Sequence, residues 1–363
     1  MLASAMEVTT ARYIYEIDAT KYLGGELRLL HRKKVYILGG RRALNAALPR
    51  IEPSLIDEGI QFEVGIFEGY CTYENAQAHA MLLHASGCDS IVGVGGGKCL
   101  DTAKIISKLA GVPLGMIPTQ LGTCVCCTNM AIVYESSGAY LGACHPDKPI
   151  SFVLADYSLL VESPIRCTAS GIVDSMAKYP ELNFTQRNDF TCFDEDESTA
   201  KAGHIMASGT WQLYLANGRQ AYADHAAGII SPSFTSIVNT NLVTTGVISG
   251  LARGSKQLAI AHSLYNNSTT VFPEVWRNYM HGEIVSVGVV IQQYYNDAPQ
   301  EEIDDFISIA KDLNAPVCFK DLGLEGSSEE LDAIQQAISK DFKQFGSREI
   351  NKLRDALERS IVV

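Results

Sequence analysis

The stretch Ser90–Lys104, SIVGVGGGKCLDTAK, constrains the fold more than any other part of the chain. A β-branched run ends in Gly95-Gly96-Gly97, and the residues after Lys98 are apolar at helical spacing, which predicts a buried strand, a tight turn and a helix. Glycines let backbone N–H groups approach an anion closely, and a helix start favours negative charge. The expected occupant is a pyrophosphate. An ordinary strand-to-helix turn would look the same, and the motif matches neither G-x-G-x-x-G nor a Walker P-loop.

Similar strand candidates lie on both sides of this stretch and alternate with helix-like segments. They are Val35–Leu38, Phe62–Phe67, Ser90–Val94, Pro113–Ile117 and Phe152–Ala155. Such alternation is typical of parallel strands with crossover helices, so we expect a doubly wound, Rossmann-like α/β sheet. Two further runs, Ala131–Glu135 and Ala139–His145, flank Ser136-Ser137-Gly138 and predict a hairpin.

After about Tyr157 the sequence becomes rich in Ala, Leu, Glu, Lys and Gln, and Ser163-Pro164 is typical of a helix start. We therefore expect two domains: an α/β nucleotide-binding domain over residues 1–158 and an all-helical metal-binding domain over residues 159–363. With 363 residues, 47% of them hydrophobic, the chain can bury two such cores. The sequence lacks a low-complexity linker, so we expect ligands to bind in a cleft between the domains.

Composition also narrows the partners. A formal net charge of −12 argues against nucleic-acid binding, and no apolar run reaches the roughly 18 residues of a membrane span. The start has no basic residue before Arg12 and no apolar core, unlike a secretory signal. Ten cysteines without framework spacing indicate reduced thiols. We expect a cytoplasmic protein that acts on a small molecule.

The glycine-rich stretch also carries a family resemblance. GVGGGKCLDTAK (Gly93–Lys104) closely resembles the glycine signature of glycerol dehydrogenases, in the iron-containing alcohol dehydrogenase family. Pro118-Thr119 and Thr123 resemble the following loop, and the likeness extends from Val35 to LNAPVCFKDLGL near the C-terminus. It implies a dehydroquinate synthase-like fold, with the glycines on the pyrophosphate and the Pro-Thr loop beside the nicotinamide. The cofactor-binding residues expected are Gly39, Arg41, Gly95, Gly96, Gly97, Lys98, Asp101, Thr119, Thr123 and Tyr134.

Three segments of the second half resemble the metal-ligand segments of the same family. They are G-I-V-D ending at Asp174, A-H-S-L around His262, and H-G-E beginning at His281. By this resemblance these three residues bind the metal, and one carboxylate with two imidazoles suits Zn²⁺ and also Fe²⁺. A lone histidine on an apolar helix is usually a packed core residue. Because the chain has only eight histidines, a chance match to both histidine motifs is improbable, and the two matches together favour a metal site.

The first departure from glycerol dehydrogenases concerns the cofactor. NAD-specific members carry an acidic residue at the end of the first strand, where this chain has Gly39, followed by Gly40 and Arg41. Loss of a carboxylate and gain of Arg41 favour a 2′-phosphate, so we expect NADP(H) to be preferred and NAD(H) to be the alternative. Arg41 would otherwise only cap a surface helix.

Other departures concern the substrate. Cys124 replaces an aspartate that contacts the polyol in glycerol dehydrogenases, which disfavours glycerol as the substrate. The C-x-x-C run that begins at Cys124 is expected to form an apolar wall rather than a redox pair. Lys178, one helical turn after Asp174, would receive a substrate carboxylate or neutralise Asp174. Tyr265 would relay protons or only pack. Together with the missing F-E-S-G-G stretch, these features resemble the NADP-dependent hydroxycarboxylate dehydrogenase branch, from which Tyr265 and Asn267 still differ.

We therefore predict a metal-dependent oxidoreductase that transfers hydride between NADP(H) and a small 2-oxo or 2-hydroxy acid or a hydroxyketone, with Lys178 and Tyr265 as catalytic candidates. One alternative is an NAD-linked glycerol or polyol dehydrogenase. Another is a dehydroquinate synthase-like cyclase, which would need a glutamate ligand where this chain has Asp174. A third is a non-catalytic nucleotide binder. Because members of the family usually self-associate, we expect a homo-oligomer.

Overall fold

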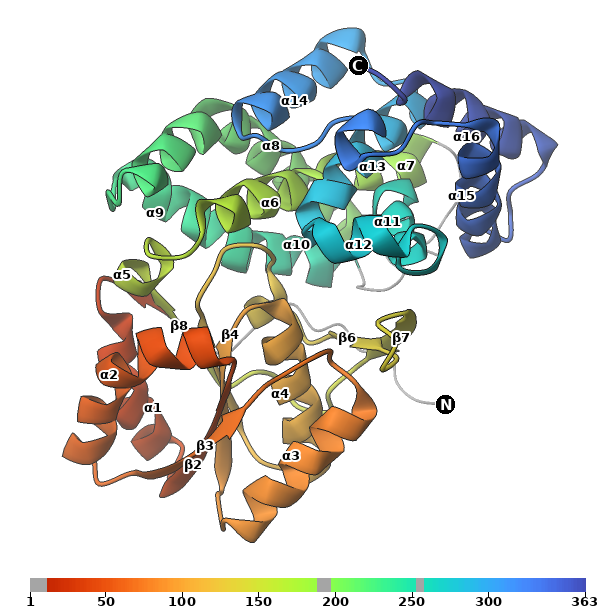
Figure 1. Cartoon of the computed structure of the whole chain (residues 1–363). Coiled ribbons are helices and arrows are strands. Elements are labelled where there is room, and N and C mark those ends of the chain that lie inside the picture. The colour runs from red at the N-terminus through yellow and green to blue at the C-terminus, as the bar shows by residue number, and fades with distance from the viewer. Residues whose placement is uncertain (1–11, 188–196, 253–257) are drawn as a thin grey trace. The chain divides into compact units, whose positions relative to one another are not determined.

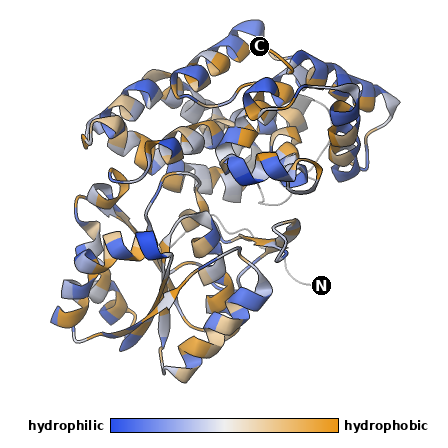
Figure 2. Cartoon of the chain, viewed as in Figure 1, coloured by the Kyte–Doolittle hydropathy of each residue, from blue (hydrophilic) through white to orange (hydrophobic). Residues whose placement is uncertain are grey.

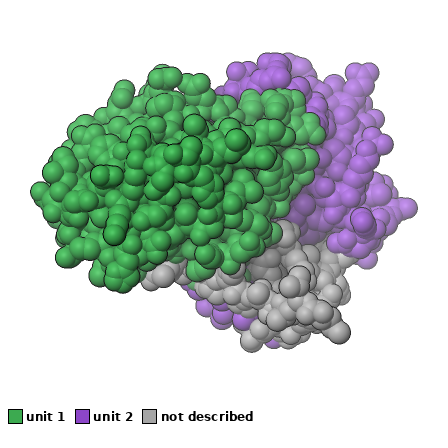
Figure 3. Space-filling model, turned by 90° about the horizontal axis from the view of Figure 1, so that it is seen from below, with its two compact units in different colours: residues 1–164, 224–250 green, residues 165–223, 251–363 purple. Residues whose placement is uncertain are grey.

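The computed structural model describes residues 12–187, 197–252 and 258–363 (Figure 1). Its contacts divide the chain into two compact units, coloured green and purple in Figure 3. The sheet unit extends to Pro164 and also contains Asp224–Gly250, whereas the helical unit contains Ile165–Ala223 and Leu251–Val363. The first boundary lies near the predicted one at residue 158. The segment predicted to lack a secretory signal, residues 1–11, is outside the described residues.

The sheet unit is built on one parallel sheet in the strand order β1-β8-β5-β4-β2-β3, with a separate antiparallel hairpin, β6-β7. The doubly wound sheet and the hairpin are thus confirmed. β1 was not predicted, because four residues at a sheet edge give too short a pattern to recognise. The strands are β1 (Tyr13–Glu16), β2 (Lys34–Gly39), β3 (Gln61–Ile66), β4 (Ser90–Gly95), β5 (Leu114–Pro118), β6 (Ala131–Tyr134), β7 (Tyr140–Cys144) and β8 (Phe152–Asp156).

Helices cover both faces of the sheet. α1 (Leu23–Leu29) packs with α2 (Arg41–Asp57) on one face, and α3 (Tyr73–Ala85) packs with α4 (Gly97–Ala110) on the other (Figure 1). The strand order reverses at β2, which lies between β3 and β4. In open α/β sheets, ligands bind outside the carboxyl ends of the strands at such a point. The fold therefore directs attention to the ends of β4, β2 and β3.

Residues 224–250, which the sequence assigned to the helical domain, cluster with the sheet unit. They form the end of α8 (Glu197–Ala226), α9 (Pro232–Asn239), a π-helical turn η3 (Thr240–Thr244) and most of α10 (Thr245–Leu251). Asn239 accepts a hydrogen bond from Tyr13 Oη at 3.0 Å and donates one to Tyr157 Oη at 2.8 Å. These partners are far apart in sequence, so composition alone could not assign the segment.

The helical unit is organised around α13 (His281–Tyr295), whose residues are buried almost throughout, as expected for a helix that is apolar on all sides. It contacts α6, α7, α11, α14 and α16. By contrast α16 is mostly hydrophilic in Figure 2 and buries only Leu353, Ala356 and Leu357. The remaining helices are α5 (Tyr157–Leu160) in the sheet unit, and α6 (Ile165–Met176), α7 (Lys178–Arg187), α11 (Ile260–Val271), α12 (Pro273–Asn278), α14 (Gln300–Asp312), α15 (Ser328–Asp341) and α16 (Ser347–Arg359) in the helical unit.

All strands in the described part of the chain end by Asp156, so the predicted change to helices is confirmed. Within the same residues, none of the helices combines the length and the apolar character needed to cross a bilayer.

Candidate functional site

The glycine turn has the geometry of an anion site. β4 ends at Gly95, whose φ of 157° side chains rarely adopt, and α4 begins after Gly96 without a side-chain cap. A Cβ on Gly96 would lie 1.9 Å from Gln120 Nε2, so no larger residue fits there without moving Gln120. The uncapped N–H groups at the start of a long helix favour a phosphate group.

The loop after β5 lies directly against this turn. The Thr119 amide donates to the Gly95 carbonyl oxygen at 3.1 Å, and Thr123 Oγ1 lies 3.4 Å from where a Cβ of Gly97 would be. The structure thus brings together two predicted loop residues and the glycines. Gln120 was not predicted, because nothing in the local sequence shows that its side chain turns back onto Gly96.

Lys98 and Tyr134 lie beside the same turn, together with an aromatic residue that the sequence did not suggest. Lys98 Nζ lies 4.7 Å from the centre of the Tyr70 ring, and the rings of Tyr70 and Tyr134 are 6.2 Å apart. A cation over an aromatic face is held electrostatically. Tyr70 therefore positions Lys98, while Tyr134 is buried behind it.

Asp101, one of the predicted cofactor-binding residues, forms hydrogen bonds with other parts of the sheet unit. It is buried, and its carboxylate accepts from Lys104 Nζ at 2.9 Å and from the Ile132 amide at 3.0 Å. Lys104, itself fully buried, also donates to the Met130 carbonyl oxygen at 2.6 Å. A buried charge needs such pairing. Asp101 and Lys104 therefore connect α4 to β6 and to Met130 just before it, and the cofactor-binding role of Asp101 stays a prediction.

The cysteine-rich part of the same loop is buried packing. Cys126 and Cys127 lie in η2 (Val125–Cys127) and are both 1% exposed, with their sulfurs 3.7 Å apart. A Cβ on Gly246 of α10 would lie 2.8 Å from the Cys127 carbonyl oxygen, so this close approach requires glycine. The described cysteines are free thiols, and Cys192 lies outside the described residues.

The end of β2 is too crowded for a side chain at Gly39, the position where the sequence lacks the acidic residue of NAD-specific members. A Cβ on Gly39 would lie 2.8 Å from Leu44 and from the Val94 carbonyl oxygen. Gly40 then caps α2, and Arg41 is its first residue. Arg41 forms an exposed ion pair with Glu68, with Nε and Nη2 each 3.2 Å from Oε1. Glu68 was not predicted.

Asp174, His262 and His281 converge in the helical unit from α6, α11 and the first residue of α13. Asp174 Oδ1 lies 3.3 Å from His262 Nε2 and 3.0 Å from His281 Nε2, and the three ligand atoms lie within 4.8 Å of one another. The carboxylate is 5% exposed, but the imidazoles are 20% and 27% exposed, which leaves an approach from their side. A catalytic metal site needs such an open position.

The electrostatics of this cluster suit a cation. Asp174 Oδ1 is buried, and no hydrogen bond of good geometry from a described residue reaches it, although two Nε2 atoms lie close. Burial alone would raise the pKa of Asp174, but His281 and His262 hold it well below its usual value. The Asp174 carboxylate therefore stays negatively charged, with both imidazole Nε2 atoms within 3.3 Å of it.

The glycine and glutamate of the H-G-E motif position His281. A Cβ on Gly282 would lie 1.9 Å from the Ser170 carbonyl oxygen, so only glycine lets α13 approach α6 this closely. The Glu283 carboxylate accepts a hydrogen bond from the Met280 amide at 2.8 Å and thereby caps the N-terminus of α13. Arg166, on the same helix as Asp174, binds Glu283 through Nε at 2.5 Å and Nη2 at 2.6 Å. These contacts fix His281 beside Asp174.

His262 is positioned by a buried carboxylate that the sequence did not reveal. Glu181 Oε1 accepts from His262 Nδ1 at 2.6 Å and from its backbone amide at 3.2 Å. A proton on Nδ1 leaves the Nε2 lone pair for a ligand. Burial alone would lower the pKa of His262, but the Glu181 carboxylate raises it to about 9. Glu181 lies on α7 and Asp174 on α6, so no spacing along a single helix could have suggested this partner.

Both catalytic candidates lie next to residues of the metal-site cluster. Lys178 Nζ lies 3.7 Å from Glu181 Oε2, so the lysine balances part of the Glu181 charge. Tyr265 is 6% exposed, and its ring packs edge-on against His281 at 4.1 Å. Its hydroxyl oxygen accepts from Trp276 Nε1 at 3.1 Å. These contacts are compatible with packing by Tyr265 and charge balance by Lys178, and the catalytic roles of both residues stay predictions.

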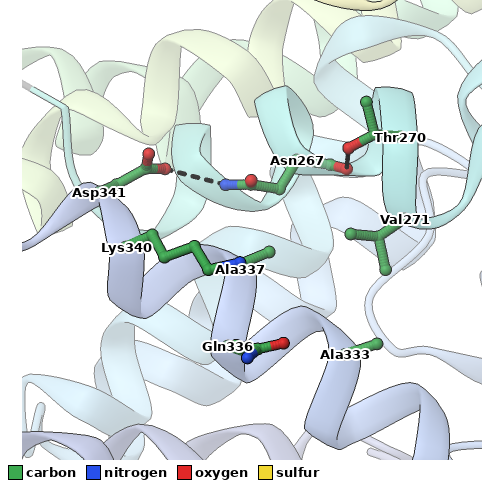
Figure 4. A pocket seen from close by; sticks show the side chains of 8 residues that line it. All are labelled: Asn267, Thr270, Val271, Ala333, Gln336, Ala337, Lys340 and Asp341. Carbon is green, nitrogen blue, oxygen red and sulfur yellow. Dashed lines mark hydrogen bonds between the residues drawn. The ribbon is translucent and has the colours of Figure 1, made fainter.

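Asn267 lies at a pocket between α11 and α15 (Figure 4). Figure 4 shows Asn267 and Asp341 pointing toward one another, with Nδ2 and Oδ2 2.8 Å apart. Asp341 Oδ2 also accepts from Ser263 Oγ at 2.6 Å. These bonds hold α11, the helix of His262, against α15.

Comparison with known proteins agrees with this geometry. Residues 10–157 match the family model of iron-containing alcohol dehydrogenases. The chain is 27% identical over 315 residues to a glycerol dehydrogenase of Escherichia coli O6:H1, covering 86% of this chain and 83% of the relative. It is 28% identical over 255 residues to hydroxycarboxylate dehydrogenase A of Escherichia coli K12, covering 70% and 67%.

The fold also matches a solved structure. A probable glycerol dehydrogenase from Sinorhizobium meliloti superposes with a TM-score of 0.83 at 23% identity, covering 99% of this chain and 100% of that one. In its N-terminal part the chain is similar to iron-containing alcohol dehydrogenases, over most of its length it is similar to glycerol dehydrogenases, and it has the fold of a probable glycerol dehydrogenase.

Proposed function

We propose that the enzyme transfers hydride between NADP(H) and a small 2-oxo or 2-hydroxy acid or a hydroxyketone, with the metal held by Asp174, His262 and His281. The observation that carries this proposal is the buried Asp174 Oδ1, which two imidazole nitrogens approach without a hydrogen bond of good geometry. Similarity to hydroxycarboxylate dehydrogenase A supports the substrate class.

The donor set fits a divalent cation. One carboxylate oxygen and two imidazole nitrogens, with partly exposed imidazoles, suit Zn²⁺ with an open position, and Fe²⁺ would also bind. A cation held there supplies the charge that favours loss of the alcohol proton and, in reverse, polarises the carbonyl group. Glu181 holds the Nδ1 proton of His262, and Asp174 contributes a negative charge to the ligand set.

The sheet unit would supply the dinucleotide. The glycine turn would hold the pyrophosphate through backbone N–H groups, with Gln120 and Thr123 in contact with the same ligand. Arg41, the first residue of α2, would bind a 2′-phosphate, which is the reason for proposing NADP(H).

An NAD-linked polyol dehydrogenase is the second candidate. The likeness to glycerol dehydrogenases covers most of the chain, and the pairing of Lys178 with Glu181 does not favour capture of a substrate carboxylate. A cyclase is not proposed, because the relatives named above are dehydrogenases and the expected glutamate ligand is replaced by Asp174.

The test follows the absorbance of NADPH or NADH with zinc- or iron-loaded protein and separate substrates. Oxidation of NADPH by 2-oxobutyrate or 2-oxoglutarate, abolished by a chelator and in Asp174→Ala, is the expected result. Oxidation of NADH by dihydroxyacetone alone would replace the first candidate by the second. Turnover that survives both metal removal and Asp174→Ala would overturn the proposed role of the metal.

A further inference from the structure

Three neighbouring strand ends form the edge where the dinucleotide would lie. β2 pairs with β4 on one side, with Gly39 opposite Val94, and with β3 on the other, with Gly39 opposite Ile66. Neighbouring strands are about 4.8 Å apart, so the end of β3 lies about 10 Å from the glycine turn. A pyrophosphate on that turn would place the adenosine ribose over the ends of β2 and β3.

The end of β2 cannot itself present a side chain to a ribose. A Cβ on Gly39 would meet Leu44 and the Val94 carbonyl oxygen, and Gly40 has none. The neighbouring strand lies close here, because the Phe67 amide donates to the Gly39 carbonyl oxygen at 2.9 Å. Any charged group that contacts the ribose must therefore come from the residues just beyond these strand ends.

Arg41 and Glu68 are two charged residues that lie just beyond these strand ends. Their side chains are 72% and 70% exposed and meet at 3.2 Å, one at the start of α2 and one just after β3. The chain at Glu68 is positioned, because Asn75 Nδ2 donates to its carbonyl oxygen at 3.0 Å and to that of Tyr70 at 3.2 Å. Such exposed pairs contribute little to stability, so both groups are available to a ligand at small cost.

We propose that Arg41 and Glu68 together read the adenosine ribose of the dinucleotide. Glu68 accepts hydrogen bonds from the free hydroxyls of NAD(H), and Arg41 binds the 2′-phosphate of NADP(H), the two interactions by which such folds distinguish the cofactors. This inference rests on the proposed function. Glu68 then opposes the NADP(H) preference that Arg41 creates, because it competes for the guanidinium group and repels the phosphate. The enzyme should accept both cofactors.

Dissociation constants of NADPH and NADH, measured by nicotinamide fluorescence on the full-length enzyme, test the pair. Glu68→Gln should tighten NADPH and weaken NADH, shifting the ratio of the two constants by about tenfold, as expected for loss of one charged interaction. Arg41→Gln should shift the ratio in the opposite direction. Glu63→Gln, which removes an exposed carboxylate from β3 itself, should leave the ratio unchanged.

The outcomes separate this inference from the proposed function. If the enzyme binds both dinucleotides but Glu68→Gln leaves their ratio unchanged, the pair does not read the ribose, while the proposed function stands. If neither dinucleotide binds the unmodified enzyme, the proposed function itself fails. Calorimetric titrations with ADP-ribose and its 2′-phosphate, which lack the nicotinamide, show whether the shift persists; a shift that persists must arise at the adenosine end.

Discussion

Replacing Glu181 by Gln should weaken the metal site without removing a ligand. The change keeps the volume of the side chain and one oxygen acceptor, but it removes the buried charge that holds His262 through Nδ1 at 2.6 Å and its amide at 3.2 Å. Loss of such a partner typically lowers metal affinity about 10–100-fold, which is about 1.4–2.7 kcal/mol. The variant would also remove the negative charge 3.7 Å from Lys178 Nζ, and the lysine charge would then oppose a bound cation more strongly.

The assay is competition for Zn²⁺ between the protein and a chromophoric chelator at fixed pH, with unfolding of the metal-free protein followed separately. Asp341→Asn is the matched control, since Asp341 also holds α11 but through Ser263 and Asn267. It should cost stability and leave the affinity for Zn²⁺ unchanged. Wild-type affinity in Glu181→Gln, within about twofold, would refute the reasoning, as would equal losses in both variants.

Three further outcomes are expected. Gly282→Ala would force a Cβ to within 1.9 Å of the Ser170 carbonyl oxygen, so denaturant unfolding should show a loss of about 1–3 kcal/mol; an unchanged midpoint would contradict the close approach of α6 and α13. Gly96→Ala must displace Gln120, and titration should show weaker binding of NADPH and NADH alike but unchanged affinity for Zn²⁺. Burial lowers the pKa of His79 below its ordinary value of about 6.5, so the stability it contributes is present above that pH and is lost as the pH falls through the folded-state pKa. As the pH is lowered from about 7.5 to 5, the melting temperature of His79→Asn should therefore fall less steeply than that of the wild type. An unchanged slope would show that His79 does not contribute to the pH dependence of stability.

Local sequence determined much of the architecture. Strands and helices follow from periodicity between near neighbours, so the alternating sheet, the hairpin and the change to helices after Asp156 were all predictable. The glycine turn was predictable for the same reason, because Gly95–Gly97 and the strand and helix around them are contiguous. Family resemblance added Asp174, His262 and His281 as metal-ligand candidates, and it did so through motifs of three or four residues.

Tertiary structure decided what depends on residues distant in the chain. The pairing of Glu181 with His262 joins positions 81 residues apart, and Asp101 accepts a hydrogen bond from Ile132, 31 residues away. Glu68 reaches Arg41 only because β3 pairs with β2. A carboxylate looks the same in sequence whether it binds a cofactor, orients an imidazole or neutralises a lysine. Its role depends on which groups the packed helices and strands bring within about 3 Å of it, and that distance is set by the fold.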